Sequence, residues 1–344
     1  MALNISSFTL SKKIGIDLGT ANTLVWLAGE GVMVNEPTVV AVSTEDGRVV
    51  AVGQEAKVML GRTPGNITAS RPMRDGVIAD YQVTEAMLTY FINKVAGRGL
   101  FLKPEVMVCV PAGCTQVERR AVLDATLSAG ARTAYLIEEP LAAAIGAQIP
   151  IAAPSGNMIL DVGGGAAEAA VISLGGVVNN YSVRVAGNKL DEAIAAYLRR
   201  KYNLIVGDQT AENIKLQIGS AIVPDDWAEK TLEVAGRDQI LGLPKIVVVN
   251  AKEISDALQF PLMQIVGAIK KVLEDTPPEL AADIIDKGII MSGGTAKLVN
   301  LDRLITQEIG VPAHVAEDPL LCVVRGTGIV LENLDIYKKS ITRR

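Results

Sequence analysis

The sequence predicts an α/β protein made of two similar halves. A first apolar run ends near Asp17, turns at Gly19 and resumes as a second apolar run. The same plan recurs around Asp161, where three consecutive glycines at positions 163–165 separate two apolar runs. Both stretches predict a strand, a tight turn and a second strand. We therefore expect two related sheets, each with a glycine turn between neighbouring strands.

Glycine turns of this kind suit a phosphate ligand. Without a Cβ, their backbone N–H groups can approach an anion closely. An aspartate at the strand end can hold a metal-bound water beside the turn. A single glycine turn between apolar runs is most often only a hairpin. Two turns of one design favour two halves that face each other across a cleft and bind the same polyphosphate with Mg²⁺.

Length and composition fit two domains with large cores. The chain has 344 residues, of which 49% are hydrophobic and 21% charged. Its formal net charge of −5 argues against a general nucleic-acid binder, because no basic stripe is available to neutralise phosphates. Cys109, Cys114 and Cys322 lack metal or redox spacing and are interpreted as core residues of a reduced, cytosolic protein. The single histidine, His314, lies in an expected short strand and is interpreted as structural.

Neither a membrane span nor export is expected. No window of about 18 uninterrupted apolar residues is present. The first residues lack the basic region and the cleavage pattern of a signal peptide. Residues 1–12 fit two interpretations, a short membrane-touching arm or a frayed terminus that partly packs.

In the first half, the expected elements follow the glycine turn in order. We expect strands at residues 38–42, 48–53, 105–111 and 134–137, and helices at residues 84–95 and 141–147. Glu45, Asp46 and Gly47 form the expected turn between the first two of these strands. Thr115 and Glu118 make a capping box that opens a further helix, which Gly130 closes.

Two features of the first half each fit two interpretations. Glu138 and Glu139 lie between a strand and a helix begun by Pro140, which is where α/β folds place chemistry. The alternative is that these acidic residues only stabilise the N-terminus of the helix. Leu100 and Phe101 lie at the tip of a glycine-flanked loop, which is either a lead-in to the next strand or a surface patch for a partner or bilayer.

The second half is expected to be richer in helix. We expect helices at residues 188–202, 211–218 and 301–309, and strands at residues 231–235, 245–249 and 288–292. Thr276 is the expected N-cap of a further helix, with Pro277 at its first position and Glu279 at its third. Gly293 and Gly294 follow the last strand, and such a strand-glycine-helix unit binds part of a nucleotide.

Taken together, these motifs resemble the actin, Hsp70 and sugar-kinase superfamily, and much more closely its bacterial actin branch, the MreB family. The resemblance runs nearly end to end and includes the strings Ile16 to Leu24, Gly61 to Asn66, Asp75 to Asp80, Leu136 to Pro140 and Thr276 to Leu280. It implies an actin-like, ribonuclease H-like α/β fold with duplicated domains, in which four subdomains surround a central cleft for ATP and Mg²⁺. Residues 1–150 would form the first half, with a small subdomain inserted at about 35–75. Residues 151–344 would form the second, with one inserted at about 188–260.

The resemblance also implies roles for individual residues. The first phosphate loop would comprise Gly19, Thr20, Ala21 and Asn22, and the second Gly163, Gly164 and Gly165. The adenine and the nucleoside would lie against Glu212, Asn213, Ile214 and Lys215 and against Gly293, Gly294, Thr295 and Ala296. Asp17 and Asp161 would hold waters of the Mg²⁺ shell, and Glu139 would orient the attacking water. Leu100 and Phe101 look like the membrane-inserting loop of the family.

One departure from the family concerns hydrolysis. Where the family normally has Gly-Gly-Gly-Thr-Thr-Glu, this chain has Ala166 and Ala167 in place of the two threonines. The family places a hydroxyl there against the γ-phosphate and the attacking water, so its loss predicts hydrolysis slowed by about 10² to 10³. Asn188, where the family more often has an acid, and Ala186 are further changes near the same cleft. We therefore hypothesise an ATP-binding filament protein with slow or absent hydrolysis.

Three classes of function compete. The first is a cytoplasmic filament of paired protofilaments that lies on the inner face of the cytoplasmic membrane. It would set cell shape by organising the wall-elongation machinery through transmembrane adaptors, and a degenerate paralogue that binds nucleotide and co-assembles or regulates is its variant. An Hsp70-like chaperone would need a peptide-binding domain after the nucleotide domain, and the chain stops at Arg344. A small-molecule kinase would need a second substrate pocket with a catalytic aspartate, and the filament-type strings argue against it.

Overall fold

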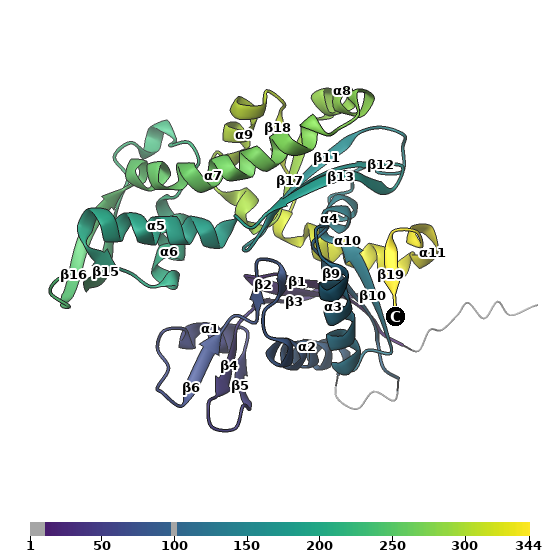
Figure 1. Ribbon diagram of the computed structural model, residues 1–344, viewed down its shortest axis with the longest axis horizontal. Coiled ribbons are helices and arrows are strands. Elements are labelled where there is room, and N and C mark those ends of the chain that lie inside the picture. Colours follow the sequence, from purple (N-terminus) through teal and green to yellow (C-terminus); the bar gives the residue numbers. More distant parts are fainter. Residues whose placement is uncertain (1–10, 98–101) are drawn as a thin grey trace, which may run out of the picture. The chain divides into compact units, whose positions relative to one another are not determined.

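The computed structural model describes residues 11–97 and 102–344. Contacts between residues group the chain into two units (Figure 1). Unit 1 contains the chain up to Val110, Cys114–Ala142 and Val323–Arg344. Unit 2 contains Pro111–Gly113 and Ala143–Cys322. Each unit has its own central sheet and is described by itself.

Unit 1 is built on a six-stranded sheet in the order β19-β10-β9-β1-β2-β3. Its strands are β1 (Lys13–Leu18), β2 (Asn22–Leu27), β3 (Gly31–Pro37), β9 (Glu105–Val110), β10 (Thr133–Glu138) and β19 (Ile341–Arg343). The first three strands pair antiparallel, β9 runs parallel to β1, and β10 runs parallel to β9.

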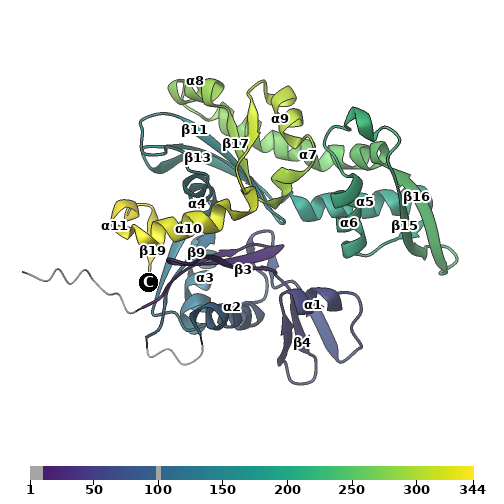
Figure 2. The ribbon, with the colours of Figure 1, turned by 180° about the vertical axis from the view of Figure 1, so that it is seen from behind.

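The faces of this sheet pack against different helices. Ile14 and Ile16 belong to a buried cluster that includes Phe91 of α2 (Tyr81–Ala96) and Val122 of α3 (Gln116–Ser128). Because side chains alternate along a strand, Gly15 faces the other way, towards Thr327 of α10 (Cys322–Glu332; Figure 2). Helix α11 (Leu334–Tyr337) also belongs to unit 1, whereas α4 (Glu139–Gly146) begins in unit 1 and ends in unit 2.

Unit 2 repeats the same sheet plan. Its strands are β11 (Asn157–Val162), β12 (Ala167–Ser173), β13 (Gly176–Val183), β17 (Ile289–Ser292) and β18 (Ala313–Val315). Their order is β13-β12-β11-β17-β18, with the first three antiparallel and the last two parallel to β11. This matches β3-β2-β1-β9-β10 strand for strand. The predicted similarity of the two halves is therefore confirmed.

A small subdomain within unit 1 has a core of its own. It contains β4 (Val40–Ser43), β5 (Val49–Val52), α1 (Gln54–Met59) and β6 (Ile67–Ser70), with the strand order β5-β4-β6. Val39, Ala41, Ala51 and Ala56 form its separate apolar cluster. The two strands expected at residues 38–53 are both present. A short hairpin of β7 (Met73–Arg74) and β8 (Val77–Ile78) follows.

The additional elements of unit 2 share the core of its main sheet. They are α5 (Gly187–Tyr202), β14 (Leu204–Ile205), α6 (Asp208–Ile218), the 3₁₀ helix η1 (Asp225–Trp227), β15 (Thr231–Asp238), β16 (Pro244–Asn250) and α7 (Ala251–Glu274). Ile194, Ile214 and Val234 lie in one continuous buried cluster with Leu160 of β11. Unlike the small subdomain of unit 1, this insertion therefore has no core of its own in the described part of the chain.

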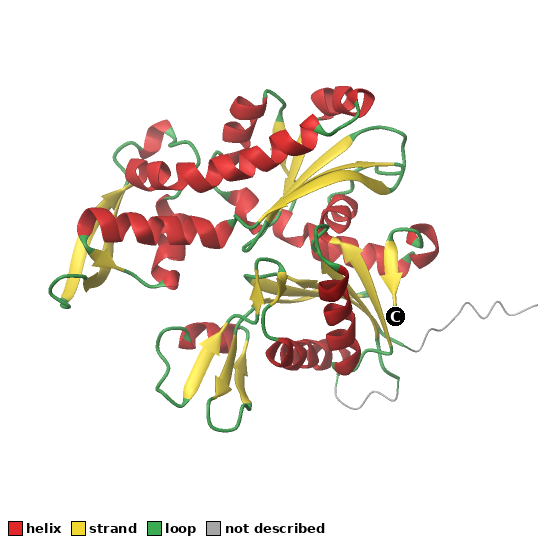
Figure 3. Ribbon diagram, in the orientation of Figure 1, coloured by secondary structure: helices red, strands yellow, loops and turns green. Residues whose placement is uncertain are grey.

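Helix α7 is the longest element of unit 2. No helix was expected in this segment from the sequence. It packs along β12 and β13 (Figure 3) and buries Ile254, Leu258, Leu262 and Ile265 at helical spacing. Pro261 in its middle is a residue that normally ends or kinks a helix, which hides the periodicity. The unit is completed by α8 (Pro278–Lys287), η2 (Gly294–Lys297), α9 (Leu301–Ile309) and η3 (Pro319–Leu321).

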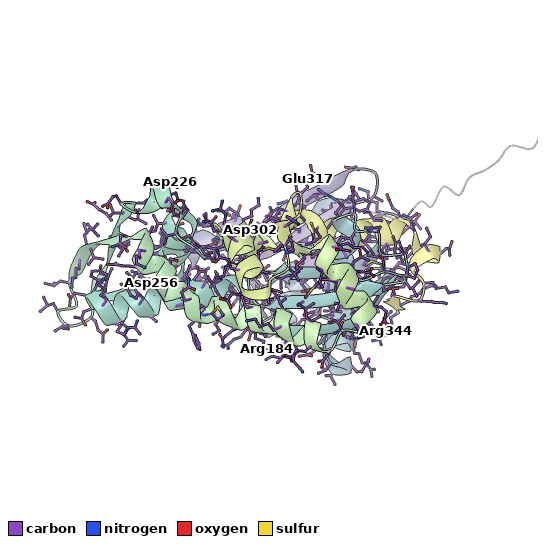
Figure 4. The ribbon with its side chains drawn as sticks, turned by 90° about the horizontal axis from the view of Figure 1, so that it is seen from above. Arg184, Asp226, Asp256, Asp302, Glu317 and Arg344 are labelled. Carbon is purple, nitrogen blue, oxygen red and sulfur yellow. The ribbon has the colours of Figure 1, made fainter. Side chains whose placement is uncertain are left out.

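Three sequence-based expectations differ from the structure. The first half was expected to extend to residue 150, but Ala143 and the residues after it belong to unit 2. Val323–Arg344 belongs to unit 1 rather than to the second half, because β19 pairs with β10 and Arg344 (labelled in Figure 4) forms an ion pair with Asp124 of α3. The expected N-cap Thr276 is wrong. Helix α8 begins at Pro278, and the Thr276 hydroxyl donates instead to the carbonyl of Val272 at 2.7 Å.

The capping box at the start of α3 provides a direct test of local stability. The Thr115 hydroxyl accepts from the N–H of Glu118, and the Glu118 carboxylate accepts from the N–H of Thr115. Thr115→Ala should lower the free energy of unfolding by about 1 kcal/mol, measured by urea denaturation. Val117→Ala, at a position that is 80% exposed in the same turn, should change it by less than about 0.5 kcal/mol. Equal effects of the two substitutions would contradict the role of the cap.

Candidate functional site

The glycine turn of unit 1 is held by threonine hydroxyls. Thr38 Oγ1 donates to the carbonyl of Gly19 at 2.6 Å and lies 2.9 Å from Thr23 Oγ1. The Thr20 hydroxyl, which is buried, accepts from the N–H of Gly76 in the β7–β8 turn at 2.9 Å. These hydrogen bonds come from the protein's own side chains and backbone, so the conformation of the turn is fixed by the fold.

Three polar groups meet where β1, β9 and β10 end. Cys109 Sγ donates to Asp17 Oδ1 at 3.4 Å, and burial raises the pKa of the Cys109 thiol well above its ordinary value, with further contributions from Asp17 and Glu139. Glu138 instead forms a 2.7 Å ion pair with Arg119 of α3. The structure thus gives the two neighbouring glutamates different partners. Glu138 pairs with Arg119 of α3, whereas the charge of Glu139 acts on the Cys109 thiol and helps to raise its pKa.

The second glycine turn is held in place by hydrogen bonds that its carbonyl groups accept. The N–H groups of Gly187 and Asn188, which begin α5, donate to the carbonyls of Gly163 and Gly164 at 3.2 and 2.8 Å. Thr295 Oγ1 also donates to the Gly163 carbonyl, at 2.7 Å. Among the described residues, no hydrogen bond is made by the N–H groups of Gly164 and Gly165. With the carbonyls of Gly163 and Gly164 occupied and these donors available, the turn fits an anionic ligand such as a phosphate.

Asp161 lies at the end of β11 and is 6% exposed. Ser292 Oγ, on the neighbouring β17, donates to its Oδ1 at 2.7 Å. Burial raises the pKa of Asp161 above its ordinary value of 3.8, while the serine bond opposes this shift. A carboxylate that is costly to ionise in the free protein would gain from a cation nearby, so this environment fits a metal.

The raised pKa of Asp161 makes a prediction about stability. The folded protein binds this proton more tightly than the unfolded chain does, so the free energy of unfolding falls as the pH rises above about 4 through the folded pKa. Asp161→Asn should therefore raise the thermal midpoint of the nucleotide-free protein at pH 7, and the gain should shrink towards pH 4. Thermal unfolding across this pH range measures it, and a pH-independent difference would contradict the assignment.

Helix α6 presents its predicted ligand residues on different faces. Lys215 Nζ donates to the Gly187 carbonyl at 2.9 Å and forms a 2.8 Å ion pair with Asp191 of α5. Glu212 lies one turn earlier on the same face. Asn213 is exposed, and Ile214 is buried in the core of unit 2. The structure therefore brings Lys215, but not the side chains of Asn213 and Ile214, to the base of the second glycine turn.

The segment after β17 also contacts this turn. Gly293 lies against the backbone of Val162, Thr295 donates to Gly163, and Ala296 is buried. Gly294 is exposed. No local motif marks Ser292, Asp191 or Thr38, because each of them donates or pairs between strands or helices that are distant in the chain.

The two alanines that replace threonines occupy different environments. Ala167 begins β12, is fully buried and belongs to the apolar core cluster of unit 2. Ala166 ends the glycine turn and is half-buried. A hydroxyl at position 166 would therefore be near the turn, whereas one at position 167 would point into the core.

Other features bear on metal and membrane binding. In residues 11–97 and 102–344, no group of three or more His, Cys, Asp or Glu residues could hold a metal ion directly. No helix in the same part of the chain has the length and apolar character needed to cross a bilayer. Leu100 and Phe101, the predicted membrane loop, lie outside the described residues.

The two sheets share one order of five strands, and in each an aspartate near the end of the first strand is followed by a glycine turn. This arrangement defines an actin-like fold. The family model of the MreB/Mbl protein matches residues 11–339. The chain is 50% identical to the cell shape-determining protein Mbl of Bacillus subtilis, over 96% of this chain and 98% of that one. It is 52% identical to the cell shape-determining protein MreB of Escherichia coli, over 95% of both. The chain belongs to the MreB/Mbl family of cell shape-determining, actin-like proteins.

Solved structures agree with this fold. Crystal structures of MreB5 of Spiroplasma citri bound to ADP and to AMPPNP each superpose with a TM-score of 0.90 at 35% identity, covering 96% of this chain and 98% of that one. A MamK double helical filament matches with a TM-score of 0.79 over 94% of this chain and 99% of its own. At 22% identity, the MamK likeness concerns the fold alone.

Proposed function

We propose that this protein binds ATP with Mg²⁺ and assembles with copies of itself into filaments on the inner face of the cytoplasmic membrane. These filaments would organise the wall-elongation machinery, through its transmembrane adaptors, and so set cell shape. The observation that carries the proposal is the repeated unit of β1 and β11, in which an aspartate and a glycine turn end the first strand of each sheet. The nucleotides bound to MreB5 support ATP as the ligand.

Each residue has a definite task in this proposal. The N–H groups of Gly164 and Gly165 bind phosphate oxygens, because the carbonyls of the turn already accept from other donors. Asp17 and Asp161 would hold water of the metal shell, and Glu139 would orient the attacking water. When bound, Mg²⁺ would neutralise charge on the phosphates. With Ala166 in place of a hydroxyl, hydrolysis is slow or absent.

An exposed apolar surface of unit 2 supports self-assembly. Ile246 and Val248 of β16 are 67% and 55% exposed, and Ile240, Leu241 and Leu243 at the tip of the β15–β16 hairpin are exposed by 61% or more. Several large exposed apolar side chains on one hairpin commonly mark an interface. We name these five residues the hairpin patch and assign it to contacts between copies. The membrane contact rests on Leu100 and Phe101.

The test incubates the purified protein with anionic liposomes and no nucleotide, ATP or a non-hydrolysable analogue. Electron microscopy and phosphate release are followed in the same tubes. Filaments on liposomes in both nucleotide tubes, with little phosphate, are expected. Leu241→Glu in the hairpin patch should abolish them, whereas Ile336→Glu, at a position 76% exposed in α11, should not. Absence of filaments from every wild-type tube would refute assembly by this chain alone.

A further inference from the structure

The two aspartates that end β1 and β11 each have a hydrogen-bond donor in the same place. In unit 2, Asp161 is in register with Ser292 of the parallel strand β17. In unit 1, the parallel pairing of β1 with β9, continued by one residue, places Asp17 beside Cys109. Because β9 and β17 occupy the same position in two sheets of equal order, Cys109 and Ser292 are structural counterparts.

Both donors contact their aspartate from inside the protein. Ser292 Oγ lies 2.7 Å from Asp161 Oδ1, and Cys109 Sγ lies 3.4 Å from Asp17 Oδ1. Ser292 is fully buried and Cys109 is 4% exposed, so bulk water does not compete for these bonds. The χ2 torsion of an aspartate is otherwise broad. A donor fixed on the neighbouring strand therefore selects one orientation of each carboxylate.

We propose that Ser292 and Cys109 are positioning residues for the metal, each holding its aspartate in the orientation that accepts hydrogen bonds from water of the Mg²⁺ shell. The inference rests on the proposed function, because it requires Mg²⁺ bound with ATP. Groups that hydrogen-bond to a metal-site carboxylate commonly orient it, and removing them weakens metal binding by about 10- to 100-fold.

The two donors differ in strength. The Ser292 hydroxyl forms a short bond to a carboxylate, which is a strong type of hydrogen bond, whereas a thiol is a weak donor. Asp161 is consequently the more firmly oriented aspartate of the two.

The test removes each donor by substitution with alanine and also exchanges serine and cysteine at the two positions. ATP affinity is measured by titration with Mg²⁺ and again in excess EDTA for Ser292→Ala, Ser292→Cys, Cys109→Ala and Cys109→Ser. Ser292→Ala should weaken the apparent Mg²⁺ affinity about tenfold. Ser292→Cys should lose less Mg²⁺ affinity than Ser292→Ala does. The Mg²⁺ affinity of Cys109→Ser should equal or exceed that of the wild type. ATP affinity in EDTA should stay unchanged in all four, which a merely structural role would not produce.

Matched controls separate the inference from general destabilisation. Ser255→Ala removes a serine of α7 that is 4% exposed and should leave the Mg²⁺ dependence unchanged. Thermal unfolding of the metal-free variants reports folding, and Ser292→Cys carries the test if the alanine variant does not fold. Wild-type Mg²⁺ affinity in the folded Ser292 variants, or an equal loss in EDTA, would overturn the inference. An absence of Mg²⁺-dependent ATP binding in the wild type would instead refute the proposed function.

Discussion

Replacing Ala166 with threonine should raise the rate of phosphate release from ATP by about 10² or more. Ala166 ends the glycine turn and is half-buried, so an added hydroxyl would lie beside the N–H groups proposed to bind phosphate. A preorganised donor at this position would stabilise the charge that develops on the γ-phosphate and would orient the attacking water. It should therefore affect turnover more than binding. The measurement is single-turnover phosphate release, with ATP affinity determined in parallel.

Ala167→Thr is the matched control. Its side chain is fully buried in the apolar cluster of unit 2, so the same hydroxyl would enter the core. We expect a loss of about 1–3 kcal/mol in the free energy of unfolding and no gain in phosphate release. If Ala166→Thr left the rate unchanged, or if Ala167→Thr raised it, the missing hydroxyl at position 166 would not be what limits hydrolysis.

Gly293→Ala should be the most damaging single substitution near the second glycine turn. Gly293 has φ 86° and ψ 162°, a conformation essentially restricted to glycine. An added Cβ would lie 2.5 Å from the carbonyl carbon of Val162 and closer still to its oxygen. Backbone atoms cannot move aside as a flexible side chain can. We expect the free energy of unfolding to fall by about 3 kcal/mol or more, measured by urea denaturation.

The substitution should also weaken ATP binding, because Gly293 directly precedes the segment whose Thr295 holds the Gly163 carbonyl. Gly310→Ala separates conformational strain from the steric clash. Gly310 ends α9 at φ 78°, and no atom lies within 4 Å of a Cβ added there. Gly310→Ala should therefore lower the free energy of unfolding by only about 1–2 kcal/mol. A similar loss for both variants would show that close packing against Val162 is unimportant.

The fold could be predicted where local patterns are strong. The two strand-turn-strand units, the capping box at Thr115 and the amphipathic helix α5 depend on residues close in sequence, and each was identified from its pattern. Helix α7 was missed because Pro261 interrupts a pattern that tertiary packing nevertheless enforces. The N-cap at Thr276 was wrong because the end of α7 supplies a competing acceptor, the Val272 carbonyl.

The contacts of the candidate site could not be predicted from the sequence. The glycine turns and both aspartates follow from motifs, whereas Ser292 lies 131 residues from Asp161 and reaches it only through the pairing of β11 with β17. Comparison with the family pattern also does not distinguish the replacement at Ala166 from the replacement at Ala167. Only the burial of Ala167 separates them, and burial depends on the packed sheet. The assigned ligand roles remain predictions.

The grouping of Val323–Arg344 with unit 1 has a consequence for synthesis on the ribosome. Almost all of unit 2, residues 143–322, is one continuous segment, so it can fold as soon as that segment has emerged. The sheet of unit 1 begins with β1, yet it lacks β19 and the packing of α10 until the last of these residues is made. Unit 1, whose first strand is synthesised before unit 2, is therefore completed after it. Gly15 of β1 can pack against Thr327 of α10 only at that stage.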